Sequence, residues 1–330
     1  MRRWWVPMPA LDAVDRQQHA MKRVLLATMP GLLAMFWLYG WGVLINLLLA
    51  CSCALVVEAG VQRLRGRSVS DLSGLVTATL LALALPPYCP WWLCVAALAS
   101  ALLLGKHLYG GNQNPFNPAM VGYALMLIAF PQPMTHWPAS HGMDLLAGLQ
   151  QVFGVQGNAP DAWAQATALD ALRINKSLTM DELFASHPAF GNVAGKGSEW
   201  VNLAFLAGGL WLLQQRVFSW HAPLGMLGSL FVISLLCLNG SGSDSHGSPL
   251  FHLLTGATML GAFFIVTEPV SGAKSLRARL MFGVGVGLLV YLIRTWGGYP
   301  DGVAFAVLLM NLAVPALERL ATPRQPAVSL

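Results

Sequence analysis

The chain has 330 residues, of which 56% are hydrophobic and only 10% are charged, and its mean hydropathy is +0.59. A soluble globular domain carries about 25% charged residues, so this composition excludes an ordinary soluble enzyme and indicates an integral membrane protein. The net charge of +5 does not predict nucleic-acid binding, because the basic residues are spread between apolar segments rather than gathered in one patch.

The apolar runs along the chain predict an all-α protein that crosses the membrane many times. A hydrocarbon layer of about 30 Å requires roughly 20 apolar residues per helix, and the runs accommodate about ten such helices. The polar start, residues 1–23, has no small-residue cleavage site, so we expect no cleavable signal peptide. The predicted spans are 24–40, 42–62, 71–86, 90–105, 117–131, 199–215, 222–238, 250–267, 279–294 and 301–317.

The distribution of Lys and Arg predicts the orientation of these spans. With both termini in the cytoplasm, 15 of the 19 basic residues lie on the cytoplasmic side, as the positive-inside rule requires. The four on the other side are Arg173, Lys176, Lys196 and Arg294. We therefore expect residues 1–131 to form an N-terminal tail with five spans, 132–198 a long periplasmic loop, and 199–330 five more spans with a C-terminal tail.

The two halves of the chain resemble each other. Leu75-Val76-Thr77-Ala78 resembles Leu254-Thr255-Gly256-Ala257, and Tyr109-Gly110-Gly111 resembles Trp296-Gly297-Gly298, at offsets near 180 residues. The fifth span ends at Pro131 and the tenth at Pro315. Because each half holds an odd number of spans, the second half must be inverted, which predicts two inverted five-helix repeats with functional sites near their interface.

Two polar features interrupt the spans. The Gly- and Asn-rich stretch 110–118 is either a tight connection at the membrane surface or a re-entrant turn that contacts a cofactor or an ion. Glu58 and Glu268 are either functional groups, as ionisable residues near spans often are, or interfacial residues solvated by lipid headgroups.

Cysteine and histidine give no sign of a metal centre. The five cysteines contain no C-x-x-C pair, so we interpret them as small core residues and expect no iron–sulfur cluster; a Cys89–Cys94 disulfide is the alternative. The histidines lack metal-ligand spacing, and we expect no metal site.

The long loop contains the stretch Asp-Ala-Trp-Ala-Gln-Ala-Thr at residues 161–167. It resembles the site at which the Rnf/Nqr family of respiratory membrane complexes carries a flavin, joined through its phosphate to a threonine. The family pattern is Asp, two free positions, Ser or Thr, a free position that is often Gly, and then Ala-Thr. Asp161, Ala166 and Thr167 match this pattern, which makes Thr167 the expected acceptor.

The sequence departs from the pattern at Ala164, where a hydroxyl residue is usual, and at Gln165, where Gly is usual. A second candidate threonine is Thr258 in the sequence Thr-Gly-Ala-Thr, residues 255–258. We reject it because the preceding Asp is missing and because a modifying enzyme would not reach a residue inside an apolar span.

The resemblance extends over nearly the whole chain, and most clearly over residues 109–123, 252–269 and 297–315. These stretches are similar to the membrane proteins that include the D subunit of the Rnf ion-translocating oxidoreductase and the B subunit of the sodium-pumping NADH:quinone reductase. The resemblance implies covalent FMN on Thr167, a flavin transferase that attaches it, and a second, non-covalent riboflavin. It also implies a complex with the A, B, C, E and G subunits in the bacterial inner membrane that couples electron transfer to Na⁺ or H⁺ movement.

The chain by itself has no nucleotide-binding fingerprint, so we expect no turnover and no catalytic residue in the isolated protein. Two alternatives remain: a urea- or ammonium-type channel without a redox role, and a structural scaffold for neighbouring subunits. The flavin motif distinguishes the redox interpretation from both, since neither a channel nor a scaffold requires it.

The predicted orientation can be measured with reporter fusions. Fusions after Arg67 and Arg324 are expected to report a cytoplasmic location, and a fusion after Gly157 an external one, because the basic residues flank the cytoplasmic ends of the spans. An external location for the fusion after Arg324 would contradict the predicted even number of crossings.

Overall fold

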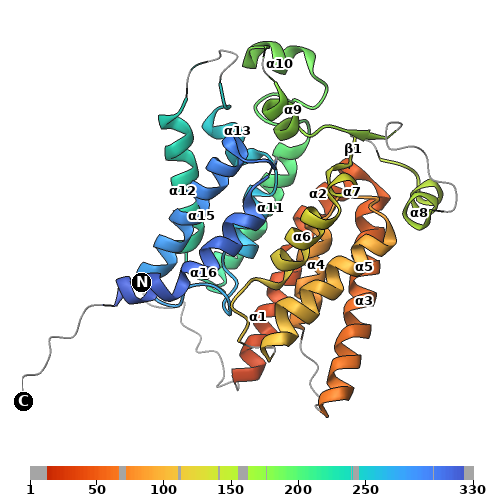
Figure 1. The fold of residues 1–330 in the computed structure, drawn as a ribbon, viewed down its shortest axis with the longest axis vertical. Coiled ribbons are helices and arrows are strands. Elements are labelled where there is room, and N and C mark those ends of the chain that lie inside the picture. The colour runs from red at the N-terminus through yellow and green to blue at the C-terminus, as the bar shows by residue number, and fades with distance from the viewer. Residues whose placement is uncertain are drawn as a thin grey trace, which may run out of the picture.

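The structure is a computed structural model that describes residues 13–66, 72–110, 113–139, 142–154, 163–175, 177–238, 240, 245–299 and 301–322. It is a bundle of helices with a small helical cap at one end (Figure 1). The helices of the N-terminal half, red to yellow in Figure 1, lie on one side of the bundle, and the teal and blue helices of the C-terminal half lie on the other. The halves meet where α2 packs on α11 and α6 packs on α16.

Helices occupy all five places predicted in the N-terminal half. The first predicted span is two consecutive helices, and the fourth changes from an α-helix to a π-helix and then to a single 3-10 turn. The elements are α1 (Ala13–Ala27), α2 (Met29–Tyr39), α3 (Trp41–Arg65), α4 (Ser73–Ala84), α5 (Trp91–Ser100), η1 (Ala101–Lys106), η2 (His107–Tyr109) and α6 (Pro118–Ala129).

The C-terminal half also has a helix at each predicted place, but the predicted span 250–267 is interrupted. The elements are α11 (Ser198–Gln214), α12 (His221–Leu236), α13 (Pro249–Leu254), α14 (Thr258–Leu260), η4 (Gly261–Ile265), α15 (Leu276–Trp296) and α16 (Val303–Ala321). Helix α16 contains Pro315 and continues beyond it, so the prediction that the tenth helix ends at this proline is wrong. Packing of the flanking turns outweighs the local cost of the missing N–H.

Five helical segments are long and apolar enough to cross a membrane, namely Asp15–Tyr39, Trp41–Arg65, Trp91–Tyr109, Leu276–Trp296 and Val303–Ala321. Shorter apolar helices are Ser73–Ala84, Pro118–Ala129 and His221–Leu236. An all-α membrane protein is therefore confirmed. The count of ten crossings and the inverted repeat stay predictions.

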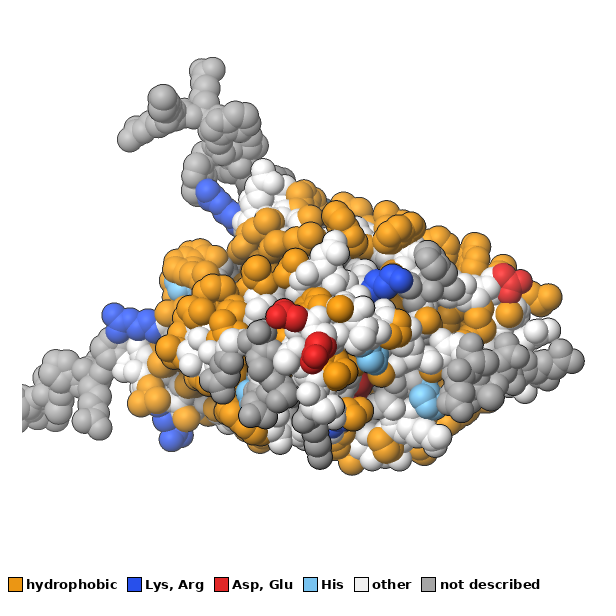
Figure 2. All heavy atoms as spheres, turned by 90° about the horizontal axis from the view of Figure 1, so that it is seen from above, with side chains coloured by type: hydrophobic (Ala, Val, Ile, Leu, Met, Phe, Trp, Pro, Cys, Tyr) orange, Lys and Arg blue, Asp and Glu red, His pale blue; other side chains and the backbone are white. Residues whose placement is uncertain are grey.

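The segment predicted as a long loop is mostly folded. It contains α7 (Pro131–Thr135), α8 (Leu145–Phe153), α9 (Ala168–Ile174) and α10 (Met180–Ser186), and a short antiparallel pair of β1 (Trp137–Pro138) and β2 (Ala164–Gln165). Helices α9 and α10 share a small core with α13, in which Leu169, Leu183, Phe190 and Phe251 are buried. Seen from above in Figure 2, this end of the molecule mixes hydrophobic side chains with a few charged ones.

Close packing of α12 against α15 depends on glycine. A Cβ at Gly283 or Gly287 of α15 would overlap the carbonyl oxygens of Ala222 and Met226, and a Cβ at Gly225 of α12 would lie 2.6 Å from the carbonyl oxygen of Leu280. Small residues four apart let membrane helices approach until their backbones touch. Gly283 and Gly287 have this spacing.

The five cysteines are free. Cys89 and Cys94 are buried in the core of the N-terminal half, and Cys51, Cys53 and Cys237 are half-buried and pack against the core. This arrangement agrees with their interpretation as small core residues rather than with a Cys89–Cys94 disulfide.

Gly283→Ala is expected to lower the free energy of unfolding by about 1–3 kcal/mol, the usual cost of overpacking. Gly228→Ala in α12 is the matched control, since a Cβ there meets no atom within 4 Å. The control is expected to be neutral or to stabilise by up to about 1 kcal/mol, because alanine favours the helix. Unfolding in mixed detergent micelles, followed by circular dichroism, measures both values, and equal effects would contradict the packing argument.

Candidate functional site

Thr167 begins helix α9. Its Oγ1 accepts a hydrogen bond from the Asp170 backbone N–H at 3.2 Å and donates to Asp170 Oδ2 at 2.7 Å, while the Thr167 N–H donates to the same carboxylate. This is a capping box, in which two unpaired N–H groups of the first helical turn are satisfied reciprocally. Thr167 is half-buried and the preceding Ala166 is exposed. The Thr167 hydroxyl is thus held in one place by hydrogen bonds at the start of a helix.

The same motif recurs at helix α10, where Thr179 and Glu182 form a second capping box. The hydrogen bonds from the Thr179 backbone N–H and hydroxyl lower the pKa of the exposed Glu182 carboxyl below its usual value. A capping box at a threonine therefore does not by itself mark a modification site. The feature that separates Thr167 from Thr179 is a cavity.

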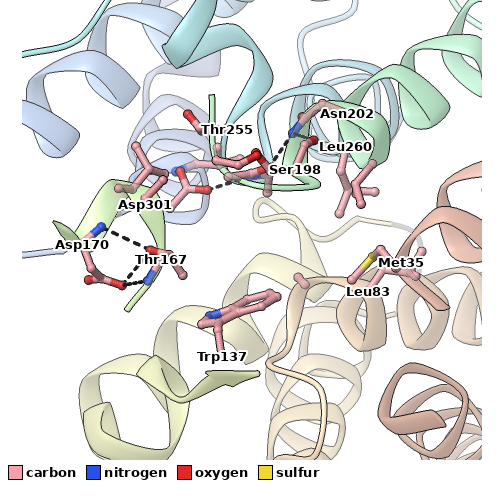
Figure 3. A pocket seen from close by; sticks show the side chains of 18 of the residues that line it. Met35, Leu83, Trp137, Thr167, Asp170, Ser198, Asn202, Thr255, Leu260 and Asp301 are labelled. Atoms are coloured by element: carbon pink, nitrogen blue, oxygen red, sulfur yellow. Dashed lines mark hydrogen bonds between the residues drawn. The ribbon is translucent and has the colours of Figure 1, made fainter. Parts of the chain in front are cut away.

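Thr167 and Asp170 line a cavity of about 180 Å³ between the helical cap and the bundle. In Figure 3, they lie on one wall, Met35 and Leu83 on another, and Ser198, Asn202 and Asp301 along the top. Most of the lining is apolar or aromatic, with a few polar groups that converge from separate elements. This is the usual composition of a site for a flat organic ligand. The aromatic lining residues are Tyr39, Tyr123, Trp137 and Phe205.

The charges around this cavity are uneven. Among the described residues that line it, Asp170 and Asp301 are acidic and Lys196 is the only basic one. A phosphate attached to Thr167 would be repelled by the two carboxylates and attracted by Lys196.

Above the cavity, the predicted eighth span is broken between α13 and α14. Gly256 has φ of +59°, a left-handed conformation that glycine adopts without a Cβ clash. The break separates backbone groups from their helical partners. An unsatisfied buried backbone group costs about 1–3 kcal/mol. The hydroxyls of Thr255 and Thr258 bind carbonyls of the broken segment, and polar side chains from other segments bind further groups.

Asn202 of α11 supplies part of this binding. Its Nδ2 donates to the carbonyl oxygens of Leu254 at 3.1 Å and Gly256 at 3.2 Å, and its Oδ1 accepts from the Met259 N–H at 3.1 Å. Ser198 Oγ also donates to the Leu254 carbonyl. One buried amide thus replaces several bonds of the interrupted helix.

Arg294 of α15 and Asp301, which precedes α16, supply further hydrogen bonds. The Arg294 side chain is only 1% exposed, and its Nη2 lies 3.0 Å from Asp301 Oδ1. Nη1 donates to the His252 carbonyl at 2.8 Å and Nη2 to Thr258 Oγ1 at 2.9 Å. Asp301 Oδ2 accepts from the Ala257 N–H at 2.8 Å. The ion pair therefore holds both sides of the break.

The residues singled out from the sequence differ in their surroundings. Thr167 lines the cavity, and Ala166 lines it beside Thr167. Asp161 lies outside the described residues. Thr258 is fully buried and its hydroxyl bonds within the break, which agrees with its rejection as a modification site.

The two carboxylates near the predicted cytoplasmic ends have protein partners. Glu58 Oε1 lies 2.7 Å from Lys106 Nζ and 3.3 Å from His107 Nε2. Glu268 accepts hydrogen bonds from the backbone N–H and the hydroxyl of Ser271. Both groups therefore have protein partners.

Sequence reasoning missed Asn202, Arg294 and Asp301. Arg294 entered only as one of four external basic residues, and Asn202 was not singled out within its span. A signal was available, because a charged or amide side chain inside an apolar run is a functional or structural polar site by default.

The fold and this site define a class: an all-α membrane protein with a folded cap, in which Thr167 lines a cavity between the cap and the bundle. The chain belongs to the NQR2, RnfD, RnfE family, whose model matches residues 6–326. It is 62% identical over 324 residues to the D subunit of the ion-translocating oxidoreductase complex of Ectopseudomonas mendocina, covering 97% of this chain and 94% of that protein. The D subunits of the same complex from Pseudomonas aeruginosa and Cellvibrio japonicus are 61% and 49% identical, covering 96% and 97% of this chain and 93% of each relative.

Asn202→Ala is expected to be strongly destabilising, since it leaves the Gly256 carbonyl and the Met259 N–H without the partners they have in the native chain. Each lost bond to a buried group costs about 1–3 kcal/mol. The free energy of unfolding in detergent measures the effect. Asn192→Ala, at an exposed position of the cap, is the control and is expected to change stability by less than about 0.5 kcal/mol. Similar losses in both variants would contradict the role given to Asn202.

Proposed function

We propose that this chain is a membrane subunit of an ion-translocating oxidoreductase complex and that it carries electrons through an FMN joined by its phosphate to Thr167. The family membership and the names of the relatives support the first part. The observation that carries the second part is the position of Thr167, whose side chain lines an aromatic and apolar cavity.

The residues around the cavity suit a flavin. The isoalloxazine ring is flat and largely apolar, and Tyr39, Tyr123 and Trp137 offer it aromatic surface. Lys196 would hold the phosphate, as the basic side chain of the described lining. When attached, the flavin supplies one- and two-electron transfer, and the protein supplies its position and electrostatic environment. The walls of the cavity would shield the ring from water.

The chain acts as part of a larger assembly. We propose the A, B, C, E and G subunits of the complex as its partners and a flavin transferase as its modifying enzyme. Both termini would lie in the cytoplasm and residues 132–198 in the periplasm of a bacterium with this complex in its inner membrane. Electrons would come from a neighbouring subunit, so that no turnover is expected from this chain alone. A non-covalent riboflavin belongs to the same proposal, without assigned ligands.

Coupling to Na⁺ or H⁺ movement is the remaining part of the proposal, and a second cavity supports it. This cavity of about 210 Å³ is lined by the N-terminal part of α4 and by Asn117, Glu268 and Arg279, whereas the C-terminal end of α4 lines the first cavity. Ile265 lines the first cavity and Val266 lines the second. The same pair of cavities is what favours the alternative, a channel of the urea or ammonium type without a redox role.

Covalent flavin distinguishes these functions. In a host that contains the flavin transferase, the denatured wild-type band is expected to fluoresce in a gel, and Thr167→Asn is expected to abolish the signal. Asparagine lacks the hydroxyl that forms the phosphoester but remains a good N-cap, so helix α9 keeps its start. Thr167→Ala should also abolish fluorescence and should cost about 0.5–2 kcal/mol of stability through the lost cap.

Thr179→Asn is the matched control, because Thr179 forms the same kind of capping box at the start of α10, in the same helical end of the protein. It is expected to fluoresce as strongly as the wild type. A fluorescent Thr167→Asn band would show that the acceptor is another residue. A wild-type band without fluorescence would instead favour the channel.

A further inference from the structure

Helix α9, which carries Thr167 at its start, is only 7 residues long. A helix of this length has almost no stability of its own. Its position, and with it the position of anything attached to Thr167, must therefore be set by what it packs against.

Helix α9 packs against the break between α13 and α14. A Cβ at Gly256 would lie 2.5 Å from Asp301 Oδ2, 2.9 Å from Arg294 Nη2 and 2.9 Å from Leu169 Cδ1. Leu169 is two residues from Thr167 and is buried. Leu169 of α9 therefore packs against Gly256 at the place where the Arg294–Asp301 ion pair also contacts this turn.

The other end of α9 is bound to the same region. Arg173 Nη1 donates to the carbonyl of Gly298, in the connection between α15 and α16. Arg294, at the end of α15, and Asp301, just before α16, flank that connection. These two contacts add to the packing of α9 in the core that it shares with α10 and α13. They depend on how this ion pair arranges the break and the connection.

The ion pair is also placed asymmetrically with respect to the cavity. Asp301 lines the cavity that Thr167 faces, whereas Arg294 lies behind it against the broken helix. Neutralising Arg294 would leave a carboxylate beside the cavity without its counter-charge. Neutralising Asp301 would leave the buried Arg294 guanidinium without a counter-charge.

We propose that Arg294 and Asp301, with Gly256, are positioning residues for the flavin on Thr167: they seat helix α9 on the broken span and balance the charge beside the cavity. This inference rests on the proposed function. It links the flavin site mechanically and electrostatically to an interrupted helix of the bundle.

The electrostatic part is tested with the full chain, flavinylated in cells and purified in detergent, by a redox titration of its absorbance. Arg294→Gln is expected to lower the midpoint potential of the flavin, because an unpaired negative charge disfavours added electrons. Asp301→Asn is expected to raise it, and the double variant should return close to the wild-type value. A merely structural role would not give shifts of opposite sign. Arg277→Gln, at an exposed position near the other end of α15, is the control and should leave the potential unchanged.

The seating part is tested by Gly256→Ala. In-gel fluorescence should persist, while the flavin anisotropy of the native chain should fall, because α9 loses its seat. Gly154→Ala is the matched control, since Gly154 has the same left-handed backbone at φ +70° but open space around its Cβ. It should keep the wild-type anisotropy. This pair decides the outcome even if a charge variant does not accumulate.

The outcomes separate the two proposals. Flavinylated Arg294→Gln and Asp301→Asn chains with the wild-type potential, or a Gly256→Ala chain with the wild-type anisotropy, would overturn this inference alone. A wild-type chain that carries no covalent flavin would overturn the proposed function and this inference with it.

Discussion

The polar groups that a broken helix exposes in a buried site must find partners within the protein, and the architecture around Gly256 follows from that constraint. Asn202 and Arg294 come from α11 and α15, and Asp301 precedes α16; each binds backbone groups of the break. These elements are thereby fixed relative to one another at the depth of the cavity. Without the break there would be no reason for a buried arginine there, and without the arginine the break would be too costly to keep.

The two halves of the chain use similar sequences in different ways. Thr77 and Ala78 lie within the regular helix α4, whereas Thr255 and Gly256 form the interruption between α13 and α14. Alanine disfavours the left-handed backbone that Gly256 adopts. A buried ion pair also occurs in each half, Lys106 with Glu58 in the first and Arg294 with Asp301 in the second. In the half that carries the break, Arg294 and Asp301 also bind backbone groups of the broken helix.

The cap is not an independent unit laid on the bundle. Its core includes Phe251 of α13, and Leu169 reaches the Gly256 turn. The residue that we propose to carry the flavin therefore belongs to a helix whose supports lie in the bundle. A redox group held in this way would respond to changes in the broken span, since packed elements move together or not at all. This gives a physical route by which electron transfer on one side of the molecule and movement within the bundle could be connected.

The sequence by itself determined the class of protein, the places of the helices and, through a resemblance over nearly the whole chain, the family. These depend on local properties: the length of apolar runs, helix-breaking residues and a short stretch of residue types. The sequence did not determine that the long loop folds into α8–α10, that α16 passes through Pro315, or that Thr167 faces a cavity. Only the tertiary structure decided which side chains bind the break, because Asn202 meets Leu254 across 52 residues and Arg294 meets His252 across 42. Hydrogen-bond partners so distant in the chain are chosen by packing, and no local pattern encodes that choice.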